Sequence, residues 1–185
     1  MQNIVVTYKL HYIVMVFTMA MFFSCNANFK KVQKIGVSEN EPIGVAEHIN
    51  LKYTDSGKVQ AILKSPIMFD YSNRKFAYNE FTEGINLELF DKHGNKNTVI
   101  ADYAVSYSKT NIIDLQGNVV VATHNKDTLF AQQLFYDTVK EWLYTNQPVT
   151  YISKDNLING NGFDSDKEFS NAEVLEVTGD IIVRE

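Results

Sequence analysis

Two hydrophobic patterns divide the chain. Residues 12–23 form an unbroken apolar run, YIVMVFTMAMFF, and a polar stretch follows Cys25. From residue 49 onward, apolar and polar side chains alternate, beginning with Ile49, Leu51 and Tyr53. Alternation with a period of two is typical of β-strands that bury one face. The pattern therefore predicts a short apolar segment at the N-terminus, followed by a domain built of strands.

Turn residues separate the alternating runs. Asp55, Ser56 and Gly57 stand between two such runs, and this arrangement predicts a β-hairpin. Similar runs continue to residue 121, and Asn, Asp and Gly supply most of the turns, since the chain has only three prolines. A helical period is visible only over residues 78–84, which is short for a helix. We therefore predict an all-β domain.

A weak repeat underlies the strands. Blocks that contain a strand, a turn and a returning strand lie at residues 101–108, 131–137 and 160–166, about 30 residues apart. Such a period indicates stacked units, here hairpins, with an edge strand left at each end of the stack. A β-sandwich with evenly spaced strands would produce a similar pattern. Both architectures are compatible with the repeat.

The N-terminal segment has the layout of a secretion signal. At about 1.5 Å per residue, residues 12–23 would cover roughly 18 Å of a hydrocarbon core about 30 Å thick, so the run is short for a transmembrane helix. A serine and Cys25 follow two phenylalanines, and this sequence resembles a bacterial lipobox. We predict a lipoprotein signal peptide at 1–24, the lipidated Cys25 with a flexible tether at 25–46, and a folded domain at 47–185. An uncleaved N-terminal helix is the alternative, and either anchor places the domain outside the cytoplasm.

Composition narrows the chemistry. Cys25 is the only cysteine, so we expect no internal disulfide in the exported domain. The net charge of −5 argues against a nucleic-acid-binding protein, which usually carries a basic face. The four histidines have no partner at metal-ligand spacing, and the sequence contains no phosphate loop or nucleophile motif. We expect no enzyme, no cofactor and no metal, and the remaining enzymatic alternative is a glycan-cleaving pair of carboxylates that meets only in space.

Four segments carry a resemblance to a known family. They are residues 46–59 (AEHINLKYTDSGKV), 101–104 (ADYA), 114–120 (DLQGNVV) and 159–163 (NGNGF). Together they resemble the folded domain of the LptC family of membrane-anchored periplasmic lipopolysaccharide export proteins. The last two are similar to the LxGxV and GxGF elements of the wider LptA/LptC/OstA group. The order and spacing of the segments carry the resemblance, which covers residues 40–183.

The resemblance implies an open, twisted β-jellyroll made of stacked antiparallel hairpins. Its apolar groove would hold the acyl chains of lipid A, with the protein at the periplasmic face of the inner membrane. There it would receive lipopolysaccharide from an inner-membrane ABC transporter and pass it to a periplasmic bridge, in which neighbouring jellyrolls pair edge to edge. The anchor departs from the family, because well-known members keep an uncleaved N-terminal helix whereas this chain has a lipobox-like Cys25.

Alternation predicts which side chains line the groove. They are Val99, Ala101, Tyr103, Val105, Tyr107, Ile113, Leu115, Val119, Val121, Leu134, Tyr136, Trp142 and Tyr144. The register is open after Phe130, because a slip by one residue would exchange the two faces.

Strand addition at the sheet edges is the predicted mode of partner binding. The hairpin at residues 49–63 would pair with the transporter's periplasmic jellyrolls, and the last strand, residues 174–183, with an LptA-like bridge protein. The alternative function is a lipoprotein that binds carbohydrate through exposed aromatic side chains.

Overall fold

The computed structural model describes Met15, residues 41–154 and residues 156–179. The chain divides into two compact units, residues 1–38 and residues 39–185, and the described strands all belong to the second. The predicted signal peptide, Cys25 and most of the predicted tether therefore lie outside the described residues. The first strand begins at Gly44, slightly before the predicted start of the domain at residue 47.

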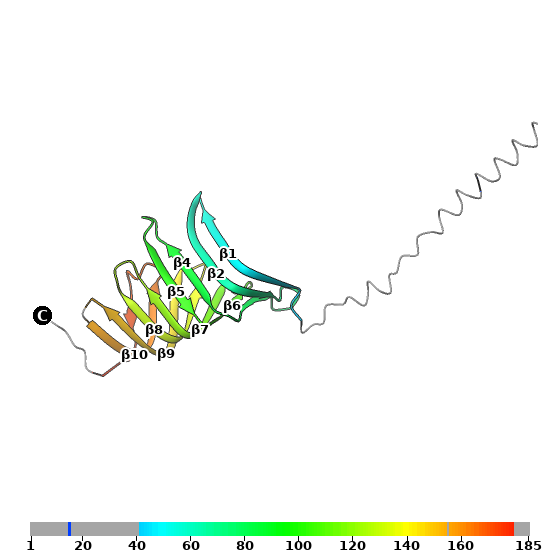
Figure 1. Cartoon of the computed structure of the whole chain (residues 1–185). Helices are drawn as coiled ribbons and strands as arrows, with labels where there is room; N and C mark the ends of the chain where they lie inside the picture. The colour runs from blue at the N-terminus through cyan, green and yellow to red at the C-terminus, as the bar shows by residue number, and fades with distance from the viewer. Residues whose placement is uncertain (1–14, 16–40, 155, 180–185) are drawn as a thin grey trace, which may run out of the picture. The chain divides into compact units, whose positions relative to one another are not determined.

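Twelve strands form one sheet within the described residues, and every pair of neighbours is antiparallel (Figure 1). Across the sheet the order is β11-β10-β9-β8-β7-β5-β4-β2-β3-β6, with β1 beside β2 and β12 beside β10. This arrangement confirms the predicted all-β fold of antiparallel hairpins. The bounds are β1 Gly44–Asp55, β2 Lys58–Asp70, β3 Tyr78–Phe81, β4 Ile85–Phe90, β5 Lys96–Ala101, β6 Tyr103–Tyr107, β7 Ile112–Ala122, β8 Thr128–Asp137, β9 Trp142–Ser153, β10 Asn156–Asp166, β11 Glu173–Val174 and β12 Val177–Thr178.

The first hairpin shows why the turn residues matter. Asp55 pairs with Lys58, so only Ser56 and Gly57 form the loop. Both have positive φ, 49° and 77°, which is the geometry of a two-residue type I′ turn. Such a turn matches the right-handed twist of the flanking strands, and it allows β1 and β2 to remain paired along most of their length.

Bends in the long strands fold the sheet into two walls. In β7, residues 112–116 pair with β6, whereas residues 120–122 pair with β5. The break between them lies at Gly117 and Asn118, which have φ of 72° and 45°. Register shifts interrupt the pairing of β8 and of β10 in the same way. Wall A contains β4, β5 and residues 49–55, 58–65, 119–122, 128–131, 149–153 and 156–161. Wall B contains β3, β6 and residues 44–47, 67–70, 112–116, 134–137, 142–145 and 163–166.

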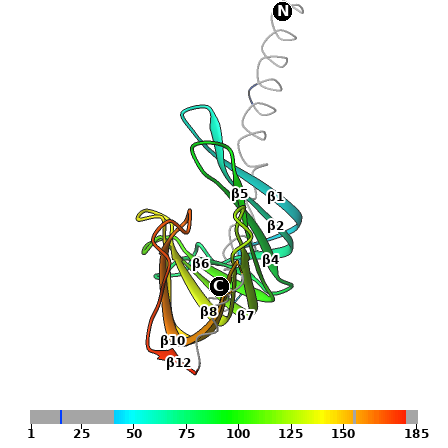
Figure 2. The ribbon, with the colours of Figure 1, turned by 90° about the vertical axis from the view of Figure 1, so that its left-hand side faces the viewer.

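The core fills the space between the two walls. Val99, Val121 and Leu129 of wall A are fully buried, and so are Leu134 and Leu143 of wall B. All of them belong to a single cluster of packed apolar side chains. Figure 2 shows the tips of the β1–β2 and β4–β5 hairpins projecting beyond the rest of the sheet. The fold is therefore a folded-over sheet whose inner faces pack on each other.

Candidate functional site

The interior opens at the end of the domain that carries β1. A pocket of about 590 Å³ lies there between the two walls. Wall A contributes leucines and an alanine from β1, β2 and β4, and wall B contributes Ile113 and Tyr136. Val139 and Glu141, from the turn between β8 and β9, line it as well. A pocket of this volume is within the range of about 300–1,000 Å³ that is usual for ligand sites.

The pocket exists because wall A extends beyond wall B. Leu51, Leu63 and Leu87 lie side by side on β1, β2 and β4, since they are paired in register. Leu87 is only 3% exposed, whereas Leu51 at the outer strand is 52% exposed. The same row of leucines therefore runs from the packed core to an uncovered apolar surface. An apolar chain entering here would meet side chains that already face the interior.

An ion pair fixes the segment that closes the interior beside the pocket. The Lys167 Nζ lies 2.5 Å from the Glu141 Oε1, and the Lys167 side chain is only 8% exposed. The Lys167 backbone carbonyl accepts a hydrogen bond of 2.7 Å from the Asn97 side chain in β5. This contact ties the chain beyond β10 to wall A. The interior is thus closed near β5 and open near β1.

Two titratable groups at the pocket have shifted pKa values. Burial, reinforced by the carboxylates of Glu141 and Asp137, raises the pKa of the Tyr136 phenol well above its usual value. The pKa of Asp137 is lowered, chiefly because its carboxylate accepts hydrogen bonds from the backbone N–H groups of Lys140 and Val139, at 2.9 and 3.0 Å. These bonds hold the turn that borders the pocket.

Eight of the thirteen predicted groove residues face the interior. Only Ile113 and Tyr136 line the open pocket. The other six are packed between the walls and almost fully buried: Val99, Ala101, Leu115, Val119, Val121 and Leu134. The sequence pattern therefore found the inner face, but most of that face is filled core. That these residues contact lipid stays a prediction.

The other five predicted groove residues lie on the opposite face of their strands from the apolar cluster between the walls, so their predicted orientation is wrong, although Val105 is only 6% exposed. Tyr103, Val105 and Tyr107 pair with polar or outward positions of β7, whereas Ala104 pairs with the buried Leu115. The reason is a bend after β5, where the Asp102 N–H donates to the Gly117 carbonyl and β6 starts in the other wall. Alternation counted through this bend assigns the wrong face.

The same error affects Trp142 and Tyr144. Leu143 pairs with the buried Tyr136 and faces the interior, so its two neighbours point outward. The Tyr144 ring stacks on Phe135 at a centroid distance of 5.3 Å, and the Trp142 Nε1–H donates to Asp164. The β8–β9 turn, with Glu141 at φ 54°, sets this register.

The four leucines at the pocket mouth were absent from the predicted groove. Leu51 and Leu63 lie in the first predicted hairpin, and Leu87 and Leu89 lie in a run of alternating residues. Each run alone indicated an inner face. What the sequence did not reveal is that β2 pairs with β4, which places the two leucine pairs next to each other.

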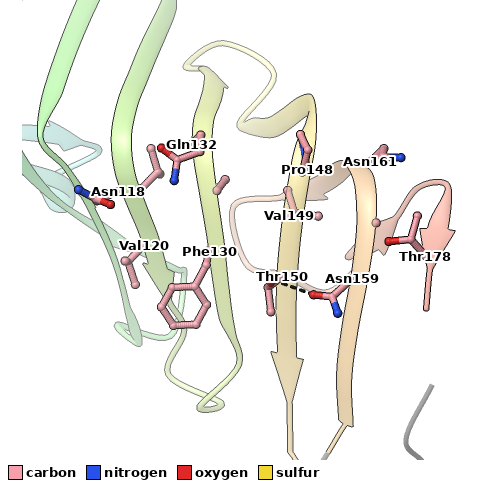
Figure 3. Close-up of a pocket in the computed structure, with 13 residues that line it drawn as sticks. Asn118, Val120, Phe130, Gln132, Pro148, Val149, Thr150, Asn159, Asn161 and Thr178 are labelled. Atoms are coloured by element: carbon pink, nitrogen blue, oxygen red, sulfur yellow. Dashed lines mark hydrogen bonds between the residues drawn. The ribbon is translucent and has the colours of Figure 1, made fainter. Parts of the chain in front are cut away.

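A second hollow, of about 620 Å³, lies along the bends of β7–β10 (Figure 3). Val120, Phe130 and Thr150 line it from neighbouring strands, and the Thr150 hydroxyl donates to the Asn159 side-chain oxygen at 2.8 Å. Side-chain amides and a hydroxyl border much of this hollow. The pocket beneath β1 is the better match for an apolar ligand because four leucines line one of its walls.

Comparison with known proteins assigns the fold to a family. A family model described as "Lipopolysaccharide-assembly, LptC-related" matches residues 12–181. The chain belongs to the LptC family. Membership places this LptC-family protein in lipopolysaccharide transport. Proteins of the family are periplasmic, inner-membrane-associated transport and binding components, and the family is not a known enzyme family. No curated protein matches the chain significantly.

The described residues contain neither a membrane-spanning helix nor a metal-binding cluster. None of their helices is long and apolar enough to cross a bilayer. Within the same part of the chain, no group of three or more His, Cys, Asp or Glu side chains is arranged to hold a metal ion.

Proposed function

We propose that this LptC-family protein is anchored to the inner membrane and carries lipopolysaccharide from the transporter to the periplasmic bridge. The acyl chains of lipid A would enter the pocket beneath β1, and the sugar headgroup would stay in water. The observation that supports this most is the row formed by Leu51, Leu63 and Leu87, which continues from the core to an exposed apolar surface.

Burial of acyl chains supplies the binding energy in this proposal. Each buried methylene contributes about 0.8 kcal/mol, and association costs about 4 kcal/mol or more, so roughly five or more methylene groups must be buried before binding is favourable. Two of the charged side chains that line the pocket, Lys167 and Glu141, are paired with each other. Directional movement requires an energy source, which the ATP-driven transporter would provide.

The edges of the sheet supply the proposed docking sites. β1 pairs only with β2 among the described strands, so its other edge is available along its length. Strand addition from a jellyroll of the transporter would use the hydrogen-bonding groups of this edge. The bridge protein, an LptA-like jellyroll, would pair at the opposite end of the sheet, beyond β10.

We propose Cys25 as the anchor. Replacing it in Cys25→Ala should release the protein into the soluble fraction, because one thioether-linked lipid is the membrane attachment in this proposal. Fractionation of cells that express the full chain measures this. Retention of the variant in the membrane would show instead that residues 12–23 anchor the protein as an uncleaved helix.

Site-specific crosslinking tests the lipid path. A photoreactive residue in place of Tyr53, which lines the pocket, should trap lipopolysaccharide in cells. The control position is Lys109, which is exposed in the β6–β7 turn outside the pocket. Equal trapping at both positions, or trapping at Lys109 alone, would exclude the groove as the lipid path.

Carbohydrate binding is the second candidate, supported by the outer face of wall B. Tyr103, Trp142 and Tyr144 lie there together with Asp114, which accepts hydrogen bonds from two glutamine side chains. Aromatic rings beside planar polar groups are typical of sugar-binding surfaces. A titration with soluble glycan would detect such binding, and a response to glycan without one to lipid A would favour this function.

A further inference from the structure

The last part of the described chain covers the edge of β10. We call residues 173–178 the strap. β11 pairs with β10 at Phe163 and Asp164, and β12 pairs with it at Asn159 and Gly160. Between these strands, the Asn161 N–H donates to the Leu175 carbonyl at 3.0 Å, and the Leu175 N–H donates to the Gly162 carbonyl at 3.0 Å. The strap therefore occupies the pairing groups of β10 from residue 159 to residue 164.

Two glycines allow the strap to lie so close. A Cβ added to Gly160 would lie 2.3 Å from the Leu175 carbonyl oxygen and 2.5 Å from the Val174 Cγ1. Gly162 has φ of 133°, and a Cβ there would lie 3.1 Å from the Leu175 Cβ. Since the Leu175 carbonyl is backbone, no rotamer change can relieve the contact at Gly160. Any larger residue at this position must displace the strap.

The strap is nevertheless a poor strand. β11 and β12 have two residues each, and Glu176 between them has φ of 43°. Its outer edge therefore offers no regular ladder to a partner. Val177 and Thr178 are exposed, so little burial holds this end in place. Short, exposed elements with few hydrogen bonds open more easily than the core.

The strand beneath is the better pairing surface. β10 pairs with β9 over residues 156–161 and 163–166, and only the register shift at Gly162 interrupts the ladder. This pairing holds the two segments of β10 in place whether or not the strap is present. Removing the strap would expose a long, preformed edge, and such edges take up extended strands from other chains. On the opposite side of the sheet, the edge of β1 is an available strand of this kind.

We propose that the strap closes a strand-pairing site on the β10 edge, and that the site takes the antiparallel edge strand of another β-jellyroll once the strap is displaced. The inference rests on the proposed function and changes its docking step, because the partner pairs with β10 and not with the strap. Val174 also packs against the core, so displacement opens the apolar interior at this end. Partner docking and opening of the groove are then one event.

The test uses a second copy of the full chain as the probe, because its β1 edge is a jellyroll edge of known sequence. One copy carries a photoreactive residue at Asn161, which is exposed on β10, and the other copy is isotopically labelled. Gly160→Ala should raise crosslinking to residues 44–55 of the labelled copy by about tenfold over wild type, equivalent to about 1.4 kcal/mol. Gly44→Ala is the matched control, since its Cβ would meet only the Asp70 Cβ at 3.7 Å. Both substitutions are made only in the copy that carries the photoreactive residue, so the β1 edge of the labelled copy is unchanged.

A disulfide should give the opposite result. Asn159 and Thr178 are paired partners, and residues paired in a sheet lie within the range of Cα separations that a disulfide requires. The oxidised Asn159→Cys, Thr178→Cys chain should lose crosslinking to residues 44–55, and reduction should restore it. If Gly160→Ala fails to fold, a chain that ends at Ala172 replaces it and should behave in the same way.

Hydrogen exchange in the same samples completes the test. Faster exchange at residues 173–178 in Gly160→Ala, together with the crosslink, supports the proposal. If the strap exchanges faster but crosslinking to residues 44–55 does not increase, the proposal is overturned. The proposal is also overturned if the strap remains protected from exchange in Gly160→Ala. Lipid trapping at position 53 is measured separately. Absence of lipid trapping would count against the proposed lipid path. Lipid trapping without strand pairing would exclude only the proposed role of the strap.

Discussion

Leu51→Asp separates lipid binding from folding at the mouth of the pocket. Leu51 is 52% exposed, so about half of its side chain is buried in the folded state. Complete burial of a leucine contributes about 1.5–3 kcal/mol, and we therefore expect a loss of only about 1 kcal/mol in the free energy of unfolding. Val45→Asp is the control, because Val45 lies on the same strand, is 54% exposed and does not line the pocket.

The effect on lipid should be larger than the effect on stability. Contact with an acyl chain would cover the exposed half of Leu51, which accounts for about 1 kcal/mol. An aspartate beside the acyl chain adds the cost of removing a charge from water, about 1–2 kcal/mol where partial solvation remains. The sum of about 2–3 kcal/mol corresponds to roughly 30- to 150-fold weaker binding.

An equilibrium titration of the purified full chain with fluorescent lipopolysaccharide measures this difference, and urea denaturation of the same samples measures stability. Leu51→Asp should bind weakly, and Val45→Asp should bind as the unmodified chain does. Equal affinity of the two variants, at equal stability, would refute the assignment of the pocket beneath β1.

Two further predictions concern the interior. Leu134→Ala should lower the free energy of unfolding by about 2–5 kcal/mol in a denaturant titration, because Leu134 is 0% exposed, whereas Phe130→Ala, at a 42% exposed position, should cost clearly less. Tyr136→Phe should reduce the loss of stability at high pH. The pKa of Tyr136 is raised in the folded state, so the neutral phenol stabilises the fold. This stabilisation is complete below the phenol's ordinary pKa of about 10 and is lost as pH rises through the folded-state pKa. Thermal unfolding at pH 8 and pH 11 checks this, and an unchanged alkaline slope in Tyr136→Phe would contradict it.

Local signals in the sequence were sufficient for the class of fold. Alternation and the Asp55-Ser56-Gly57 turn predicted antiparallel hairpins, and the structure confirms them. The segments DLQGNVV and NGNGF supported the family, and the structure gives their glycines a physical role. Gly117 is at the bend of β7, and Gly160 admits the strap. These requirements are local, so they are visible in the sequence.

The lining of the candidate site depended on contacts that alternation does not contain. A period of two relates side chains within one uninterrupted strand, and it fails where the chain changes walls. Asp102 is such a place, and the orientation of Tyr103, Val105 and Tyr107 was therefore predicted wrongly. The β8–β9 turn had the same consequence for Trp142 and Tyr144.

The sequence by itself determined that this chain is an all-β member of the LptC family with hairpins at recognisable turns. Only the tertiary structure decided which part of the inner face is packed core and which part is open. Val99 and Leu51 both belong to inward-facing sets on alternating strands, but wall B covers the first and leaves the second exposed. The reason is that coverage depends on how far one wall extends beyond the other, which is set by the pairing of strands distant in the sequence.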